Sequence, residues 1–449
     1  MIEPETPEVD RLFATAVLGK QIDDFFATDM GRYLQARANP EAVEYASPAL
    51  KEVLKRTHGV PIFQEQVMQV AMTAADFSPG EADQLRRSMA AWKRKGGVHK
   101  FYDRLVSGML KNGYTQEYAD QIFKQIEGFG EYGFPESHAA SFALLVYASC
   151  WLKWHEPACF LAAMLNSQPL GFYGPSQLVQ DAQRHGVEVR AVDVVFSDWD
   201  CSLEPVGSHA SFQPAVRLGL RMVSGLSKAV AERIVQQRGI AAFSSTQDLA
   251  LRSALDVGDL RSLASADALL SLSGHRRQQV WDASALRLAP ALLQGVPVEE
   301  EALVLEAAAE GEEVVFDYAA MGLSLRSHPM ALLRGQLTPK RLLTAEQMRD
   351  YPSGRLVRAC GIVTMRQQPQ TAKGVVFVTL EDETGSVNVI VWKAVKEQFR
   401  EVLYRARLMA VFGVWQKDSG GEVRHVVAKR LVDLTPLLGE LSTVSRDFH

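Results

Sequence analysis

The residues best suited to chemistry in this sequence are the cations that follow Ser78. Between residues 86 and 111 there are eight Lys or Arg residues and one acid, Asp103. Fixed positive charge at this density suits a polyanion, either a nucleotide triphosphate or a nucleic-acid backbone. Guanidinium groups fit phosphate oxygens well, because their planar fork can donate two parallel hydrogen bonds. A basic helix face that only meets solvent is the alternative interpretation.

A helix must position these cations, and its start can be identified in the sequence. Ser78 is a suitable cap, Pro79 suits the first helical position, and Glu81 completes a capping box three residues after the cap. We expect the helix to run through Met89 and to stop near Gly96. It then carries Arg86 and Arg87, with Lys93, Arg94 and Lys95 on it or just after it.

Length and composition indicate a globular chain of several domains. The 449 residues correspond to roughly three domains. Hydrophobic residues make up 47%, which is too many for a disordered protein. The net charge of −5 hides strong segregation, because residues 298–317 contain eight acids and no Lys or Arg, whereas residues 355–433 contain thirteen basic residues against eight acids. Nucleic acid therefore stays open as a partner despite an isoelectric point near 6.1.

The cysteines and the apolar segments exclude several classes of protein. The four cysteines are scattered without a Cys-x-x-Cys pair, which argues against a zinc site and a disulfide framework and fits a reducing cytoplasm. The acidic N-terminus does not look like a signal peptide. The longest apolar run, residues 139–152, is too short to span a bilayer and predicts a buried core helix. We therefore expect a cytoplasmic protein without a membrane partner.

Two aspartates offer a different chemistry. Asp198 and Asp200 flank Trp199, and such a pair is able to hold Mg²⁺ in a nucleotidyl transferase. Two close carboxylates in a turn are usually just solvated, and no third Asp or Glu stands out to complete a two-metal site. The solvated interpretation is therefore preferred.

A helix-hairpin-helix pattern follows at residues 223–238. Val223-Ser-Gly-Leu-Ser227 precedes a helix, so that Gly225 and Ser227 would direct backbone N–H groups at a phosphate without reading bases, with Lys228 beside them. Residues 259–283 are a candidate second half and contain Arg276 and Arg277. One such hairpin is a weak signal, whereas a tandem pair next to other basic modules indicates binding to DNA.

From residue 355 onward the pattern is that of a β-structure. Five strands are expected at residues 357–365, 375–382, 386–392, 407–416 and 424–434, with a helix at 394–403 between the third and the fourth. This is the order of an OB-fold, whose face commonly binds single strands. Phe377, Trp392, Phe412 and Trp415 are candidates for stacking on bases, although aromatic residues on strands usually belong to a core.

Six stretches of this sequence resemble bacterial C-family DNA polymerases, the replicative polymerase III alpha subunit and its relatives. Three stretches resemble the fingers region of that family: Gly59-Val-Pro-Ile-Phe-Gln-Glu-Gln-Val-Met-Gln69, Gly80-Glu-Ala-Asp-Gln-Leu-Arg-Arg-Ser-Met89 and Tyr132-Gly-Phe-Pro-Glu-Ser-His-Ala-Ala-Ser141. Three more resemble its error-prone, damage-inducible translesion branch: Trp151-Leu-Lys-Trp-His-Glu-Pro157, Asn166-Ser-Gln-Pro-Leu-Gly-Phe-Tyr173 and Ser445-Arg-Asp-Phe-His449. The resemblance runs from about residue 33 to the end.

The resemblance implies a multidomain α+β fold with five parts. These are an unmatched segment at 1–40, helical polymerase fingers at 41–205, a tandem helix-hairpin-helix region at 206–290, an acidic linker and connector at 291–345, and an OB-fold with a C-terminal tail at 346–449. It also implies that Arg86 and Arg87 reach the triphosphate of the incoming nucleotide, with Ser137 and His138 nearby. Lys93, Arg94 and Lys95 would then lie on DNA.

The departures from the family lead to a further expectation. Such polymerases begin with a PHP domain and a palm whose aspartates hold two Mg²⁺ ions, and we find neither pattern here. We therefore expect no catalytic residue and no metal site, in a C-terminal portion that binds DNA without polymerising by itself. The alternatives are a non-catalytic DNA-binding remnant and a split subunit whose palm is a separate polypeptide. The error-prone branch also implies mutasome companion proteins that give access to the sliding clamp.

Overall fold

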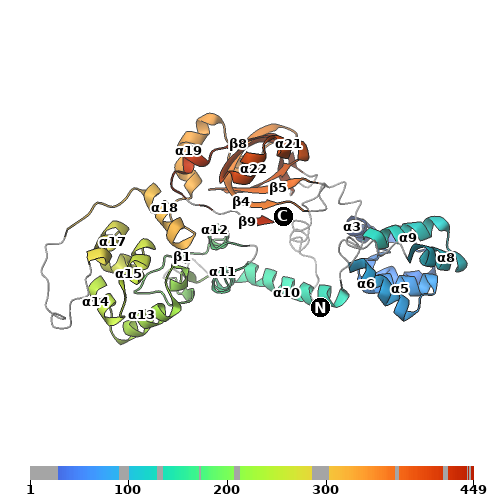
Figure 1. Ribbon diagram of the computed structural model, residues 1–449, viewed down its shortest axis with the longest axis horizontal. Helices are drawn as coiled ribbons and strands as arrows, with labels where there is room; N and C mark the ends of the chain where they lie inside the picture. The colour runs from blue at the N-terminus through green and yellow to red at the C-terminus, as the bar shows by residue number, and fades with distance from the viewer. Residues whose placement is uncertain are drawn as a thin grey trace. The chain divides into compact units, whose positions relative to one another are not determined.

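Helices make up the first part of the chain, and a barrel of strands makes up its last part (Figure 1). The structure is a computed structural model and describes residues 29–90, 101–128, 135–170, 173–206, 213–285, 303–369, 374–417, 423–441, 443 and 446–448. Contacts divide the chain into two units, Met1–Cys150 and Trp151–His449. The order of elements confirms the expected multidomain α+β class, while the five expected domain boundaries stay a prediction.

The first unit consists of helices around one hydrophobic core. Its largest fully buried side chains are those of Leu50, Leu54, Leu85, Leu105, Met109 and Ile126. The described elements are α3 (Asp29–Ala38), η1 (Pro40–Ala42), α4 (Pro48–Leu54), η2 (Lys55–Thr57), α5 (Gln64–Ala75), α6 (Pro79–Ala90), α8 (Tyr102–Lys111), α9 (Gln116–Gly128) and α10 (Glu136–His155), whose residues from Trp151 onward belong to the second unit.

The sequence determines where α4 and α6 begin. Ser47 Oγ accepts a hydrogen bond from the Leu50 N–H at 3.1 Å and so caps α4. At α6 the Ser78 N–H donates to Glu81 Oε2 at 2.8 Å, and the Glu81 N–H donates to Ser78 Oγ at 3.3 Å. The expected capping box is therefore confirmed. The predicted end of the basic helix near Gly96 lies outside the described residues.

Helices α5 and α8 approach each other closely at Gly108. A Cβ at Gly108 would lie 2.4 Å from the Ala75 carbonyl oxygen, so that only glycine fits there without movement. The Asn112 side chain donates to the Ala74 carbonyl at 3.1 Å, at the same end of α5. These contacts fix the end of α5, from which the chain enters α6.

The expectation that the apolar run at 139–152 is buried is wrong. This run forms most of α10, in which no residue is buried. Leu144 is 75% exposed and Trp154 is 64% exposed. Hydrophobic composition shows that a helix is able to be buried, but burial also needs elements that pack against it.

The second unit begins with short helices and strands that share one core, which runs in sequence from Ala158 to Leu323. Its elements are α11 (Pro157–Asn166), α12 (Pro175–Arg184), β1 (Val189–Arg190), β2 (Ser202–Glu204), β3 (Ala215–Arg217), η5 (Leu220–Met222), α13 (Lys228–Ile240), α14 (Thr246–Arg252), α15 (Val257–Ser265), α16 (Leu270–Ser273), α17 (Arg276–Ala285) and α18 (Glu310–Met321). The three strands form a sheet in the order β1-β3-β2, with β3 parallel to β1 and antiparallel to β2.

The acidic stretch at 298–317 is more than a linker. From Glu310 onward it forms α18, and Glu313 and Asp317 within it are buried. The chain then continues through α19 (Pro329–Leu337), η7 (Thr338–Lys340) and α20 (Ala345–Arg349). Val314 of α18 and Met330 of α19 share a hydrophobic cluster with strand residues of the barrel.

The last elements form a closed barrel with an additional strand. They are β4 (Leu356–Gln367), β5 (Val376–Asp382), β6 (Gly385–Val391), α21 (Lys393–Gln398), α22 (Arg400–Arg405), β7 (Leu408–Lys417), β8 (Arg424–Asp433), η9 (Thr435–Leu438) and β9 (Arg446–Phe448). The strands follow the order β5-β6-β8-β7-β4-β9, and a further β5–β4 pairing closes five of them into a barrel. Helices α21 and α22 lie between β6 and β7 in the chain, as the OB-fold prediction required.

The two sides of each strand in the barrel face different surroundings. Val357, Val378, Val389, Val411 and Val426 point into one core together with neighbours from every strand of the barrel. Strand β8 bulges opposite the Phe412–Gly413 step of β7, and a Cβ at Gly413 would lie 2.2 Å from the Val427 carbonyl oxygen. No described helix is both long and apolar enough to cross a membrane.

Candidate nucleotide and nucleic-acid sites

Arg86 and Arg87 of α6 share one carboxylate, that of Asp83. Arg86 donates to Asp83 Oδ1 from Nε at 3.0 Å and from Nη2 at 2.8 Å, and Arg87 Nη2 lies 2.8 Å from Oδ2. Residues three and four positions apart face each other on a helix, which explains this sharing. The Arg87 side chain is 74% exposed and the Arg86 side chain 37%. Both guanidinium groups therefore lie on the helix surface, where phosphate oxygens can reach them.

Asp83 was not among the residues expected from the sequence, although its spacing to the two arginines is a usable signal. The hydrogen bond from Arg86 lowers the pKa of Asp83, burial acts against this, and the charges of Arg87 and Arg86 strengthen it. Asp83 is thus an anion that orients two cations.

Arg104 of α8 holds the start of α6 in place. It donates from Nε to Glu81 at 3.1 Å, from Nη1 to the Ala75 carbonyl at 2.7 Å and from Nη2 to the Asp76 carbonyl at 2.8 Å. The backbone hydrogen bond from Ser78, followed by that from Arg104, lowers the pKa of Glu81 to about 2. These bonds join the end of α5, the start of α6 and α8, so that the two arginines lie on a well-fixed helix.

The other residues predicted near the nucleotide lie in the first turn of α10. Ser137 and His138 are exposed, and the His138 ring lies 4.4 Å from the ring of Phe142. The start of α10 is held by Glu136, whose N–H donates to Glu65 at 3.0 Å and whose carboxylate pairs with Arg56. The role of Ser137 and His138 stays a prediction. Lys93, Arg94 and Lys95 lie outside the described residues.

The first hairpin has the backbone geometry that its sequence predicts. Gly225 has φ of +83°, a left-handed conformation that favours glycine. Ser227 caps α13, since its side chain accepts from the Val230 N–H at 3.3 Å. Lys228 opens the helix and is 63% exposed, with Glu232 at 3.7 Å. A helix N-terminus, a glycine turn and an exposed cation lie within four residues, which suits a phosphate oxygen.

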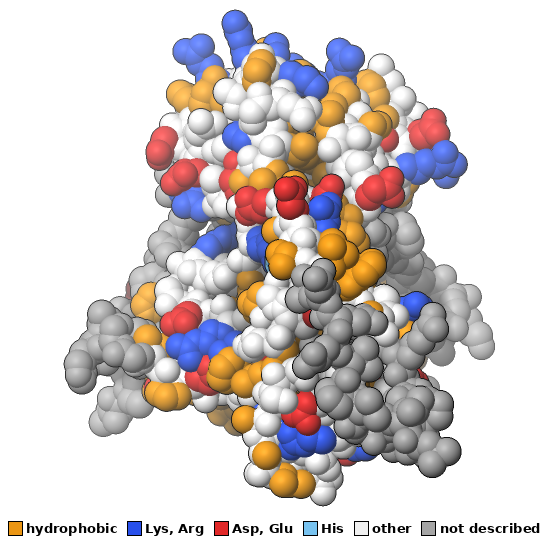
Figure 2. Space-filling view, turned by 90° about the vertical axis from the view of Figure 1, so that its left-hand side faces the viewer, with side chains coloured by type: hydrophobic (Ala, Val, Ile, Leu, Met, Phe, Trp, Pro, Cys, Tyr) orange, Lys and Arg blue, Asp and Glu red, His pale blue; other side chains and the backbone are white. Residues whose placement is uncertain are grey.

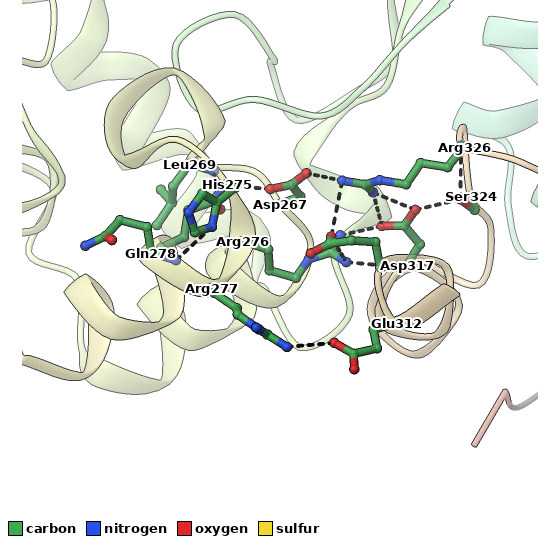
Figure 3. A network of polar contacts seen from close by, with 12 residues as sticks. Asp267, Leu269, His275, Arg276, Arg277, Gln278, Glu312, Asp317, Ser324 and Arg326 are labelled. Atoms are coloured by element: carbon green, nitrogen blue, oxygen red, sulfur yellow. Dashed lines mark hydrogen bonds and ion pairs between the residues drawn. The ribbon is translucent and has the colours of Figure 1, made fainter. Parts of the chain in front are cut away.

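Arg276 and Arg277 begin α17 but differ in burial. The Arg276 side chain is 3% exposed and pairs with Glu313 at 2.8 Å and with Asp317 of α18 (Figure 3). Arg277 is 49% exposed and pairs with Glu312 at 2.8 Å. A nearly buried guanidinium with two carboxylate partners is not available to DNA. We therefore propose a structural role for Arg276, while Arg277 stays a candidate for DNA contact.

Arg326, in the loop before α19, completes this ion-pair network. It donates to both oxygens of Asp317, at 2.8 and 2.9 Å, and to Asp267 at 2.7 Å (Figure 3). Ser324 also donates to Asp317, at 2.6 Å. The network therefore joins α15–α17, which carry the second hairpin, to α18 and to the loop that leads to α19.

The aspartate pair considered for Mg²⁺ is taken up by arginines. Asp198 pairs with Arg238 at 2.5 Å, and Asp200 pairs with Arg221 at 2.6 Å. Each carboxylate ties the short sheet to a neighbouring element. Among the described residues, no group of three or more His, Cys, Asp or Glu side chains could hold a metal ion. These residues do not fit a pair of Mg²⁺ ions.

The barrel places the four candidate aromatic residues in different surroundings. Trp415 is 3% exposed in the barrel core, so the stacking role considered for it is wrong. Phe377 is half-buried on β5, opposite Ile390 of β6, and Trp392 is half-buried at the start of α21. Phe412 is half-buried on β7 between two arginines. Stacking on Phe377 and Trp392 stays a prediction.

Comparison with known proteins identifies relatives for most of the chain. The family model for the bacterial DNA polymerase III alpha subunit finger domain matches residues 26–113. A helix-hairpin-helix motif matches residues 186–279, and an OB-fold nucleic acid binding domain matches residues 357–434. The similarity is therefore divided over three known modules in the expected order.

Error-prone DNA polymerases are similar over nearly the whole chain. Those of Alkalilimnicola ehrlichii and Bordetella parapertussis are 55% identical over 417 and 423 residues, and that of Pseudomonas fluorescens is 52% identical over 418 residues. Each match covers 93% of this chain and 40% of the relative, so the chain spans about 40% of the length of these curated relatives. Among solved structures, asparaginyl-tRNA synthetase from Pyrococcus horikoshii is 22% identical over 23% of this chain and 24% of its own, with a TM-score of 0.19, too low to support an argument.

Proposed function

We propose, on the premise that this chain belongs to the error-prone DNA polymerase family, that it is the DNA-binding and nucleotide-binding part of such a polymerase. The observation that carries the proposal is the 55% identity over 93% of the chain. The work of the whole polymerase would be translesion synthesis and mutagenesis induced by DNA damage. Mutasome companion proteins, and through them the sliding clamp, would be its partners in the cytoplasm.

Duplex DNA would be held through its phosphates by the hairpin region. Gly225 and Ser227 orient the N-terminus of α13, and exposed Lys228 and Arg277 add fixed charge. Such contacts position the duplex without reading its bases, so that binding tolerates any sequence. Binding would also weaken steeply with salt, because each phosphate contact releases counterions.

The incoming nucleotide would contact Arg86 and Arg87. Their guanidinium groups lie on one helix surface and, within the described residues, share the single carboxylate of Asp83, so that a triphosphate would offer them more negative charge. Fixed cations at this place would stabilise charge that develops during phosphoryl transfer. Magnesium would supply metal-ion catalysis in such a reaction. The described residues do not fit a pair of Mg²⁺ ions. We therefore propose that the ligands of these ions lie outside the described residues.

A nucleotide titration tests the role of the two arginines. Loss of both in R86A/R87A removes two charge-assisted contacts, and we expect the affinity for a labelled deoxynucleotide triphosphate to fall by on the order of tenfold or more. The affinity for DNA should be unchanged. The control is K55A, which removes an exposed cation of the same unit that pairs with Glu52 at 2.6 Å. A fall in DNA affinity with unchanged nucleotide affinity would show that the two arginines contact DNA and not the nucleotide.

A salt titration tests the hairpin. For K228A we expect the slope of log K against log salt on duplex DNA to become shallower by about 0.9, the value for one lost phosphate contact. Binding of the unmodified chain that does not depend on salt would contradict the proposal.

Primer extension by the isolated chain with Mg²⁺ and four nucleotides separates the two alternatives, a non-catalytic DNA-binding remnant and a split subunit. Template-dependent synthesis would refute a part that only binds, whereas synthesis only after addition of a separate palm polypeptide would indicate a split enzyme.

A further inference from the structure

Three neighbouring barrel strands place two arginines on either side of one aromatic ring. Phe412 of β7 is paired in register with Arg358 of β4 on one side and with Arg430 of β8 on the other. The guanidinium carbon of Arg358 lies 5.4 Å from the ring centroid, and that of Arg430 lies 5.8 Å away. The two arginines are exposed. Their strands are about 10 Å apart, because neighbouring strands are spaced by about 4.8 Å.

Arg358, Phe412 and Arg430 form a cationic row on the outer side of the barrel. This row lies at the border between a covered and an open area. Beyond it in one direction, Cys360 of β4 and Ala410 of β7 are buried in the cluster that includes residues of α18 and α19. In the other direction the next row consists of Leu356, Val414 and Val427, which pair across the same strands. Leu356 is 68% exposed and the two valines are half-buried. An open apolar row thus runs alongside a cationic row.

This face of the barrel carries almost no negative charge. Strands β4, β7 and β8 contain one acid, Asp433, and six Lys or Arg residues, of which Arg366 is buried and five remain. Among the described residues, no carboxylate forms an ion pair with Arg358 or Arg430. The Nη1 of Arg358 donates to the Lys340 backbone carbonyl at 3.2 Å. Figure 2 shows Lys and Arg side chains gathered among hydrophobic ones at the top of its view.

We infer that this outer face of β4, β7 and β8 binds a single-stranded polynucleotide, with phosphates on Arg358 and Arg430 and bases over the apolar row. The inference rests on the proposed function for DNA as the ligand, but it assigns a face and residues that the proposal does not use. This face differs from the surface on which stacking is predicted. Phe377 lies on β5 and Trp392 caps α21, whereas Arg358 and Arg430 lie on β4 and β8.

Charge and surface chemistry together favour this ligand. Two cations held near one ring repel each other unless an anion is present, and the contact of each with the ring contributes only about 0.5–1 kcal/mol at an exposed site. A strand of nucleic acid brings both a regular series of anions and flat apolar bases, which matches the two adjacent rows. A duplex keeps its bases stacked inside and would leave the apolar row uncovered. The face is therefore expected to prefer single strands.

The test is a salt titration with a labelled oligodeoxythymidylate of about 16 nucleotides, the upper end of site sizes for one OB-fold. In R358A/R430A we expect the slope of log K against log salt to become shallower by about 1.4, since each single-strand phosphate contact contributes about 0.7. R358K/R430K keeps both charges and should keep the slope. The control is R405A, because Arg405 is an exposed arginine of the neighbouring helix α22 that pairs with Glu401 at 2.8 Å.

The outcomes separate this inference from the proposed function. An unchanged slope in R358A/R430A, with single-strand binding by the unmodified chain intact, would refute the inference alone. Absence of any DNA binding by the unmodified chain would refute both. Equal competition by an acidic polypeptide such as polyglutamate would also refute it, because the face would then recognise negative charge without bases. The two arginines are exposed, so the variants should fold, and a thermal melt checks this.

Discussion

Replacing Arg276 with Met would remove the central cation of a buried ion-pair network. Glu313 and Asp317 would lose a partner in a place where Asp317 is 2% exposed. The neighbouring residue provides a matched control, since Arg277 belongs to the same helix turn but pairs with Glu312 at a site where both side chains are about half exposed. R276M and R277M thus make the same chemical change in buried and exposed surroundings.

The structure sets the expected size of the two effects. Removal of one partner from a buried ion pair costs about 3–5 kcal/mol, because the other charge stays buried without compensation. Asp317 would still accept two hydrogen bonds from Arg326, at 2.8 and 2.9 Å, so we place R276M at about 3 kcal/mol, the lower end of that range. For R277M we expect about 0–1 kcal/mol, the usual contribution of a surface pair.

Hydrogen exchange at the amides of α17 and α18 measures this difference, because it reports local opening in a chain of several domains. A loss of about 3 kcal/mol corresponds to exchange that is faster by on the order of 100-fold, and R277M should change it by less than about fivefold. Equal effects of the two variants would refute the reasoning. A fall in DNA affinity in R276M with unchanged exchange would show instead that Arg276 contacts phosphate.

Two further predictions concern the first unit. The added Cβ in G108A would lie 2.4 Å from the Ala75 carbonyl oxygen, so we expect a loss of about 1–3 kcal/mol in thermal unfolding. G80A has no atom within 4 Å of its added Cβ and should leave stability equal or raise it by up to about 1 kcal/mol, and similar losses in both would contradict the packing argument. The pKa of Glu81 is lowered from 4.5 to about 2, so its stabilisation is complete above about pH 5 and is lost as the pH falls toward 2. Wild type should therefore unfold at a higher temperature than E81Q near neutral pH, with a difference that disappears near pH 2; a constant difference would argue against this role of the carboxylate.

Local signals in the sequence predicted much of the fold. The Ser78–Glu81 capping box, the Ser227 cap and the individual strands of the barrel all follow from residues close together in the chain. The reason is that caps, turns and strand alternation depend on near neighbours. The helix spacing of Asp83 to Arg86 and Arg87 is a local signal of the same kind.

Burial could not be predicted in the same way. Residues 139–152 looked like a core helix and are not buried, whereas Arg276 looked like a surface cation and is 3% exposed. Trp415 and Phe412 both lie on β7, yet one fills the barrel core and the other lies between Arg358 and Arg430. In each case the surroundings come from elements that are distant in the sequence.

By itself the sequence determined most elements, their order, the resemblance to error-prone DNA polymerases and the cations on α6, because these depend on residue types and short spacings. Only the tertiary structure decided which charges are available to a ligand. Helix α18 covers Arg276 from more than 30 positions away, and pairing of β4, β7 and β8 brings Arg358 and Arg430 to one ring. Whether a cation contacts a phosphate or a carboxylate of its own chain depends on such long-range packing, which a local pattern does not contain.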